Sequence, residues 1–242
     1  MKIIFLSFNI LFCFISFMIF SSKSFAQSDK KILTNAATIQ NPPQWVSRSK
    51  VEKVTQSIEQ ELEWTIRRID IFWHQTEETY IKSQSLGTSA VAVTIKSKNQ
   101  IVHMGPQVNE QNWEQVLGHE LVHVILAQKY KKAVPSWIEE GLANHLSKRS
   151  KVNYKLLAKE APPEDLRAIG HPFRGSKSKI SYLYQVSQAL AEMLDKKCDL
   201  RRLVQISMKE DKGMDFYLKT FCSITDLNSS YREWINKKKG DL

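Results

Sequence analysis

Hydrophobic and polar positions change their spacing several times along this chain. Between residues 47 and 80, apolar side chains recur every three or four residues with charged side chains between them. The members of this series are Val51, Val54, Ile58, Leu62, Ile66, Ile69 and Trp73. Such a series lies on one face of a helix, so the pattern predicts one long helix over residues 47–80. Gly87 then ends the pattern.

Two short segments after Gly87 favour strands. Residues 90–95 are rich in valine, threonine and isoleucine, and residues 100–104 follow with a similar apolar character. Branched side chains suit a pleated sheet, and Gly105-Pro106 ends the second segment with a turn signal. The pattern therefore predicts a small sheet made of this pair of strands.

Helical spacing returns after residue 106. We expect a helix that begins at Asn109 or Asn112, both good capping residues, and ends near Tyr130. Pro135 suits the first turn of a second helix, which we place over residues 136–148.

Three or four further helices are expected over residues 179–238. The order of elements predicts a mostly helical α+β domain, with a small sheet before the helix that ends near Tyr130 and a helical C-terminal part. The length of 242 residues allows one domain. We place it at residues 47–242, after a flexible, polar lead-in at residues 27–46 that ends in a pair of prolines.

The N-terminus has the features of a secretory signal peptide. Residues 3–20 form an almost unbroken apolar run behind Lys2, and Ser24-Phe25-Ala26 supplies the small residues that a signal peptidase reads. We expect residues 1–26 to be removed and the protein to be exported, to a periplasm or out of the cell. An uncleaved membrane anchor is the alternative, since the run is long enough to span a bilayer. After cleavage we expect no membrane association.

Charge and cysteine content narrow the class of protein further. The formal net charge is +10, but the basic residues are spread along the chain without aromatic residues among them, so we expect no nucleic-acid partner. Cys198 and Cys222 remain after signal cleavage. In an exported protein they can form a disulfide or stay as two buried thiols, and the sequence leaves both open.

The helix predicted to end near Tyr130 carries His119-Glu120-Leu121-Val122-His123. Histidines four residues apart lie one turn apart on a helix, so both imidazoles can reach one zinc ion at about 2.0–2.1 Å. Glu120 lies beside that position, where it can accept a proton from a water on the metal. Two histidines with structural hydrogen bonds are the alternative. The apolar surroundings favour zinc, because a buried polar cluster is costly without a partner.

The next helix offers a third ligand in the segment Pro135-Ser136-Trp137-Ile138-Glu139-Glu140-Gly141-Leu142-Ala143. Together with the histidine pair, this segment resembles the gluzincin zinc metallopeptidases. It is most similar to bacterial peptidase MA-like domains and distantly similar to aminopeptidase N-type catalytic domains. The resemblance implies a zincin-like fold and Glu140 as the ligand before the glycine. Glu139 is the alternative, and Gly141 favours Glu140 because a glycine there lets the helix lie close to a neighbour.

Three further side chains have candidate roles around the zinc. Asn144 could accept the second N–H of a zinc-bound histidine, or be an ordinary surface residue. The segment Tyr184-Gln185-Val186-Ser187 resembles one that follows the zinc helices in peptidase MA-like domains. By that resemblance Tyr184 would donate a hydrogen bond to the oxyanion, with Tyr182 as the alternative, or a tyrosine packed in the core as a third possibility.

The substrate side is less defined. By the same resemblance, the strand at residues 101–104 would pair with an extended substrate through main-chain hydrogen bonds. His103 on that strand could face the cleft or be structural. The Gly-x-Met-Glu-Asn motif of the aminopeptidase N family is absent. The sequence therefore does not decide whether a substrate would be cleaved within its chain or at its end. It also does not decide the oligomeric state.

The sequence thus predicts an exported, Zn²⁺-dependent metallopeptidase acting on a peptide or protein substrate. His119, His123 and Glu140 would hold the metal, with Glu120 as general base and Tyr184 at the oxyanion. The alternative is a catalytically weak gluzincin-fold protein for binding or envelope assembly, because no separate substrate-binding domain is evident in the sequence.

Overall fold

The computed structural model describes residues 30–86, 90–97, 100–130, 132–148, 151–170 and 179–240. The predicted signal peptide at residues 1–26 lies outside these ranges. Within them, no helix combines the length and apolar character that crossing a membrane requires.

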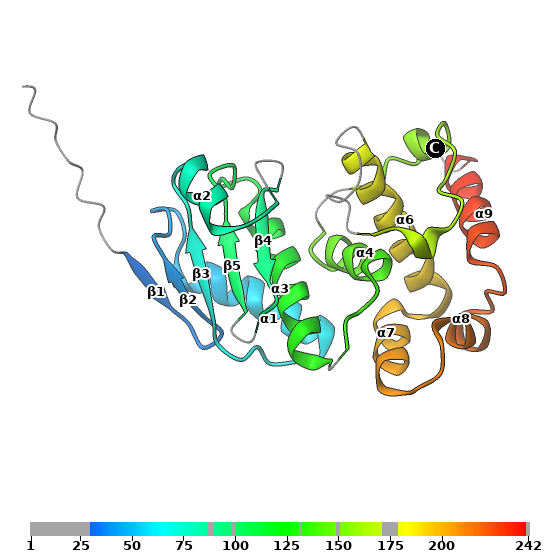
Figure 1. The fold of residues 1–242 in the computed structure, drawn as a ribbon, viewed down its shortest axis with the longest axis horizontal. Coiled ribbons are helices and arrows are strands. Elements are labelled where there is room, and N and C mark those ends of the chain that lie inside the picture. Colours follow the sequence, from blue (N-terminus) through cyan, green and yellow to red (C-terminus); the bar gives the residue numbers. More distant parts are fainter. Residues whose placement is uncertain are drawn as a thin grey trace, which may run out of the picture.

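The described chain has an α+β architecture that is mostly helical and contains one small mixed sheet (Figure 1). The strands are β1 (Lys31–Leu33), β2 (Ala37–Gln40), β3 (Ile69–Trp73), β4 (Ala92–Ile95) and β5 (Ile101–Met104). Their order across the sheet is β1-β2-β3-β5-β4. The outer pairs β1–β2 and β4–β5 are antiparallel, whereas β2–β3 and β3–β5 are parallel. Strand β4 is therefore an edge strand.

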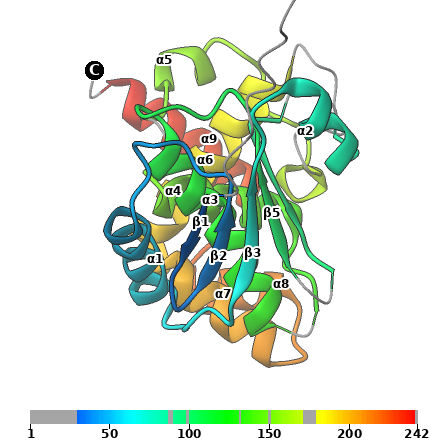
Figure 2. The same ribbon diagram turned by 90° about the vertical axis from the view of Figure 1, so that its left-hand side faces the viewer.

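The other regular elements of the described chain are helices. They are α1 (Arg48–Leu62), α2 (Glu77–Ser83), α3 (Trp113–Lys129), α4 (Ser136–Leu146), α5 (Tyr154–Leu157), α6 (Ile180–Cys198), α7 (Leu200–Lys209), α8 (Met214–Cys222) and α9 (Leu227–Gly240), with a 3₁₀ turn η1 (Leu166–Ala168). Figure 1 shows the sheet with α1 and α3 on one side of the molecule and the later helices on the other. In Figure 2 the strands lie in front and α3 and α4 lie behind them.

The helix predicted over residues 47–80 is wrong in its second half. Glu63 adopts the left-handed conformation, with φ 48°, and ends α1. The chain then enters β3, where Ile69, Ile71 and Trp73 are buried alternately. Ile69 and Trp73 also fit the four-residue spacing of a helix. The alternation of buried and exposed residues that marks a strand could therefore not be recognised from the sequence. Residues 69–73 form a strand because they pair with β2 on one side and with β5 on the other.

The flexible lead-in predicted at residues 27–46 is also wrong for its described part. Residues 31–33 and 37–40 are β1 and β2, and Ala37 and Ile39 are buried. They form strands because β3 has an open edge that β2 covers by parallel pairing. The folded unit therefore begins well before residue 47.

Other predicted elements are confirmed with small shifts. The strand pair at residues 90–95 and 100–104 appears as β4 and β5. Helix α3 begins directly after Asn112, and α4 directly after Pro135. The four helices α6 to α9 occupy the C-terminal stretch for which three or four were predicted. A Cys198–Cys222 disulfide joins the end of α6 to the end of α8, which settles the pairing that the sequence left open.

The packing of α4 against α6 is unusually close at Gly141. A Cβ atom added at Gly141 would lie 2.4 Å from the carbonyl oxygen of Ser187 and 3.1 Å from the Cβ of Ala191. Only a glycine allows this approach, as the sequence suggested. The close contact brings the helix that carries Glu140 beside the helix that carries Tyr184.

Candidate metal centre

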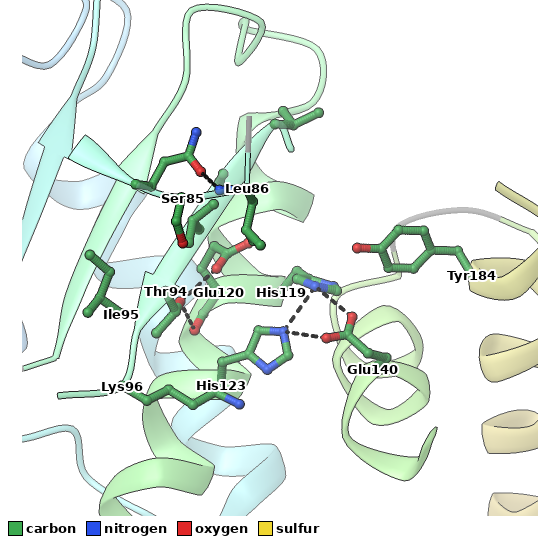
Figure 3. Close-up of a pocket in the computed structure, with 14 residues that line it drawn as sticks. Ser85, Leu86, Thr94, Ile95, Lys96, His119, Glu120, His123, Glu140 and Tyr184 are labelled. Carbon is green, nitrogen blue, oxygen red and sulfur yellow. Dashed lines mark hydrogen bonds and ion pairs between the residues drawn. The ribbon is translucent and has the colours of Figure 1, made fainter. Parts of the chain in front are cut away.

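Three side chains from two helices point toward one another beside a pocket (Figure 3). The Nε2 atoms of His119 and His123, both on α3, lie 3.2 Å apart. The Glu140 carboxylate on α4 lies 3.6 Å from Nε2 of His119 and 3.5 Å from Nε2 of His123. All three side chains are buried. The potential ligand atoms lie within 4.8 Å of one another, so this cluster could hold a metal ion.

Local structure explains why these residues meet. Helix α3 is buried around most of its circumference, as its apolar sequence predicted. Its two histidines lie one turn apart on the face that looks toward α4. Helix α4 begins after Pro135, which leaves Glu140 in its second turn. Packing between α3 and α4 then brings Glu140 to the histidine pair.

Glu139 lies behind His123 and not among the converging ligands. Its Oε1 is 2.9 Å from Nδ1 of His123 and 2.5 Å from Nζ of Lys96. Burial alone would raise the pKa of Glu139, but the hydrogen bonds and positive charges of His123 and Lys96 lower it to about 2. The alternative of Glu139 as a metal ligand therefore gives way to a role in orienting His123.

The electrostatic environment favours a cation at the cluster. Burial would lower the pKa of His123, but the charge of Glu140 and the hydrogen bond with Glu139 raise it to about 9. Burial raises the pKa of Glu140, as expected for a carboxylate removed from water. With Glu120 nearby as well, three acidic side chains surround two histidines. A proton on His123, or a metal ion between the ligands, can compensate the negative charge of these acidic side chains.

Glu120 is buried beside the cluster and is held from the sheet. The hydroxyl of Thr94, on edge strand β4, donates a hydrogen bond to Oε2 of Glu120 at 2.6 Å. The same hydroxyl lies 3.3 Å from the backbone carbonyl of Glu120. The carboxylate is thus fixed next to the potential metal ligands without being one of them, as its sequence position predicted.

A pocket of about 350 Å³ opens onto the cluster. Its walls include Glu120, Tyr184, the strand β4 and residues 84–86. The Tyr184 ring lies 6.4 Å from the His119 ring, centroid to centroid, and Figure 3 shows its hydroxyl pointing toward His119 and Glu140. The hydroxyl of Tyr182 instead donates to the carbonyl of Ala161 at 3.0 Å. Of the two candidate tyrosines, the structure brings Tyr184 to the site.

Asn144 does not take the role considered for it. Its side chain is buried, so it is not a surface residue, and its Oδ1 accepts no hydrogen bond from the described residues. Glu139 occupies the position next to the Nδ1 of His123 instead. The neighbouring His145 pairs with Asp195 at 3.1 Å, away from the cluster.

The structure does not leave residues 101–104 free for the pairing with a substrate that the sequence predicted. Residues 101–104 form β5, which is paired with β3 on one side and β4 on the other, so neither edge is open. Strand β4 is an outer strand that pairs only with β5 among the described strands, and it lines the pocket. His103 is buried on β5, where its Nδ1 lies 2.9 Å from Nε2 of His74. Its role is therefore structural and it does not face the cleft.

Two residues that contact the site were missed at the sequence level. Thr94 and Lys96 bond to Glu120 and Glu139, respectively. Thr94 lies in the strand predicted at residues 90–95 and Lys96 directly follows it, and residues two apart in an extended segment share a face. The sequence held no signal that this face turns toward the histidine helix.

Comparisons with protein-family models, with curated proteins and with solved structures give no match to this chain. Any functional conclusion therefore depends on the geometry of the site and on the sequence motif.

Proposed function

We propose that this chain is a zinc-dependent metallopeptidase with a zincin-like fold, related to the gluzincins that its motif resembles. The observation that carries the proposal is the spacing of the three ligands. In a tetrahedral zinc site with bonds of about 2.0–2.2 Å, neighbouring ligand atoms lie roughly 3.3–3.6 Å apart. The Nε2 atoms of His119 and His123 lie 3.2 Å apart, while Oε1 of Glu140 lies 3.5 Å from His123 and Oε2 lies 3.6 Å from His119. With one ligand atom taken from each residue, all three lie within 4.8 Å of one another, which supports a shared zinc ion.

The ligand set also favours a catalytic zinc over a structural one. Structural zinc sites are closed by four protein ligands, whereas catalytic sites have three and leave a position for water or substrate. Two histidines and a glutamate are such a set, and the pocket lies directly beside them. Soft sulfur ligands are not involved, because the two described cysteines form a disulfide.

The surrounding residues are arranged for hydrolysis of a peptide bond. Bound zinc would lower the pKa of a coordinated water toward neutrality and polarise the scissile carbonyl. Glu120 accepts the proton of the attacking water and passes it to the leaving amine. Its second oxygen is held by Thr94 and so does not compete for that proton. The hydroxyl of Tyr184 donates a hydrogen bond to the oxyanion.

The open edge of β4 gives the substrate a place to bind. An extended peptide can add to a free strand edge through main-chain hydrogen bonds, largely independent of its sequence. Residues 92–95 of β4 line the pocket in which Glu120 lies. We therefore assign a peptide or protein segment in extended conformation as the substrate, in place of the pairing with β5 that the sequence suggested.

Export of the protein belongs to the same proposal. Disulfides persist in oxidising compartments such as a periplasm or the extracellular space. The Cys198–Cys222 disulfide supports export, as does the apolar N-terminal segment of the sequence.

Glu120→Gln separates metal binding from catalysis and tests the proposal. The variant should keep its zinc, because Glu120 is not a ligand, and should lose cleavage of a peptide library by about 10²–10⁴-fold. Cleavage at the wild-type rate by a zinc-loaded variant would refute the mechanism. A zinc-loaded wild type that cleaves no library peptide but binds a partner tightly would favour the binding or assembly role.

A further inference from the structure

The edge strand of the sheet contacts the metal centre through a lysine. Lys96 directly follows β4, and its Nζ lies 2.5 Å from Oε1 of Glu139. That same oxygen lies 2.9 Å from Nδ1 of His123. Lysine, glutamate and histidine therefore form a continuous chain from the sheet edge to the candidate ligand.

Glu139 determines which nitrogen of His123 is available for a metal. A carboxylate can only accept a hydrogen bond, so Nδ1 of His123 must carry the hydrogen. The lone pair is then on Nε2, the atom that faces His119 and Glu140. Such partners fix both the tautomer and the ring orientation of metal-binding histidines.

Lys96 places a cation beside the buried Glu139 carboxylate. The Glu139 side chain is 8% exposed, whereas that of Lys96 is 45% exposed. A buried carboxylate without a cationic partner is costly. Among the described residues, Lys96 is the lysine or arginine within ion-pair distance of Glu139.

We propose that Lys96 is a positioning residue for the metal centre, acting through Glu139 on the orientation of His123. The inference rests on the proposed function, since it takes zinc as the metal. It joins the strand edge assigned to the substrate with the metal ligands, so the end of β4 has a role besides pairing with a peptide.

The test is a double-mutant cycle read out as zinc affinity, measured by competition with a chromophoric chelator at fixed pH. Lys96→Met and Glu139→Ala should each weaken zinc binding about 10–100-fold. Combining them should weaken binding little beyond Glu139→Ala alone, because Lys96 acts through Glu139. Lys96→Arg restores a cation at this point and should bind zinc nearly as the wild type does.

Lys82→Met is the matched control for loss of a lysine. Lys82 forms an exposed ion pair with Glu78 on α2 and does not line the pocket. Its zinc affinity should equal that of the wild type. Melting curves of the metal-free proteins report on folding, and Lys96→Gln replaces Lys96→Met should the latter not fold.

Two results would overturn the inference. Zinc affinity of Lys96→Met within twofold of the wild type would show that the lysine has no influence on the metal. Fully additive losses in the double variant would show that it acts by a route other than Glu139. The test measures zinc binding and does not depend on peptide cleavage. A wild-type protein that binds zinc but cleaves no peptide would therefore refute the peptidase proposal, and the role of Lys96 could still be tested.

Discussion

Replacing Gly141 with alanine tests the packing that brings the two halves of the site together. The added Cβ would lie 2.4 Å from the carbonyl oxygen of Ser187, whereas ordinary van der Waals contact begins at 3.4 Å. The two helices must therefore move apart by about 1.0 Å, the difference between these distances. The obstacle is backbone, so no side-chain rotation can relieve it.

The size of the effect follows from two opposing contributions. Overpacking costs about 1–3 kcal/mol, and a clash with backbone belongs at the upper end of that range. Alanine is favoured over glycine in a helix by about 0.8–1.0 kcal/mol, which offsets part of the cost. We expect a net loss of about 2 kcal/mol, which lowers Tm by roughly 4–8 °C for a chain of this size. Because α4 carries Glu140 and α6 carries Tyr184, a shift of about 1 Å should also lower peptide cleavage roughly 100-fold.

Thermal melts followed by circular dichroism measure the stability, with Gly170→Ala as the control. A Cβ added at Gly170 meets nothing within 4 Å. That substitution should leave Tm unchanged or raise it slightly, because alanine restricts the unfolded chain. A Gly141→Ala protein that melts at or above the temperature of the Gly170→Ala protein would refute the close packing of α4 and α6.

Three further outcomes are expected. Tyr184→Phe should keep zinc affinity and KM but lower kcat about 10²–10³-fold, measured with one peptide substrate, since the hydroxyl acts on the oxyanion; an unchanged kcat would contradict this role. The pKa of His123 is raised to about 9 without metal. Zinc must then displace one proton below that pH, so its affinity should rise about tenfold per pH unit up to about 9. Calorimetry in buffers of different ionisation enthalpy measures this release, and zinc binding without proton uptake by the buffer would contradict it. Reducing the Cys198–Cys222 disulfide, which closes a separation of 24 residues, should cost about 3 kcal/mol in unfolding free energy. A Tm unchanged by reductant would contradict that estimate.

The site was more predictable from the sequence than the fold was. A helix repeats every 3.6 residues, so the spacing of His119 and His123 defined a shared face without knowledge of any other element. Gly141 likewise indicated a close helix contact before its partner was known. The ligands on α3 and α4 therefore followed from local patterns.

The sheet depended on contacts between distant segments. Residues 27–46 read as polar and flexible, yet Ala37 and Ile39 are buried because β2 pairs with β3 some thirty residues later in the chain. The side chains of β3 matched a helical period as well as a strand period, and only pairing on both sides decides between them. No local pattern encodes which strand is at an edge, so the sequence did not show that β5 is paired on both sides.

The bonds of Thr94 and Lys96 to the site could not be predicted from the sequence, because they also join distant segments. Each bonds to an acidic residue at least 26 positions away, Glu120 and Glu139, respectively. These pairings follow from how β4 and the residue after it lie against α3 and α4, and no motif in the sequence expresses them. The residues of the candidate metal cluster could thus be identified from the sequence, whereas their bonding partners Thr94 and Lys96 required the structure.

The most direct test of the central claim is elemental analysis of the purified protein, beside its His123→Ala variant. The account predicts about one zinc ion per wild-type chain, and none in the variant, because the site has three protein ligands and removal of one leaves too few to hold the ion. A wild-type protein that contains no zinc, even after zinc is added back, would contradict the assignment of His119, His123 and Glu140 as a zinc site.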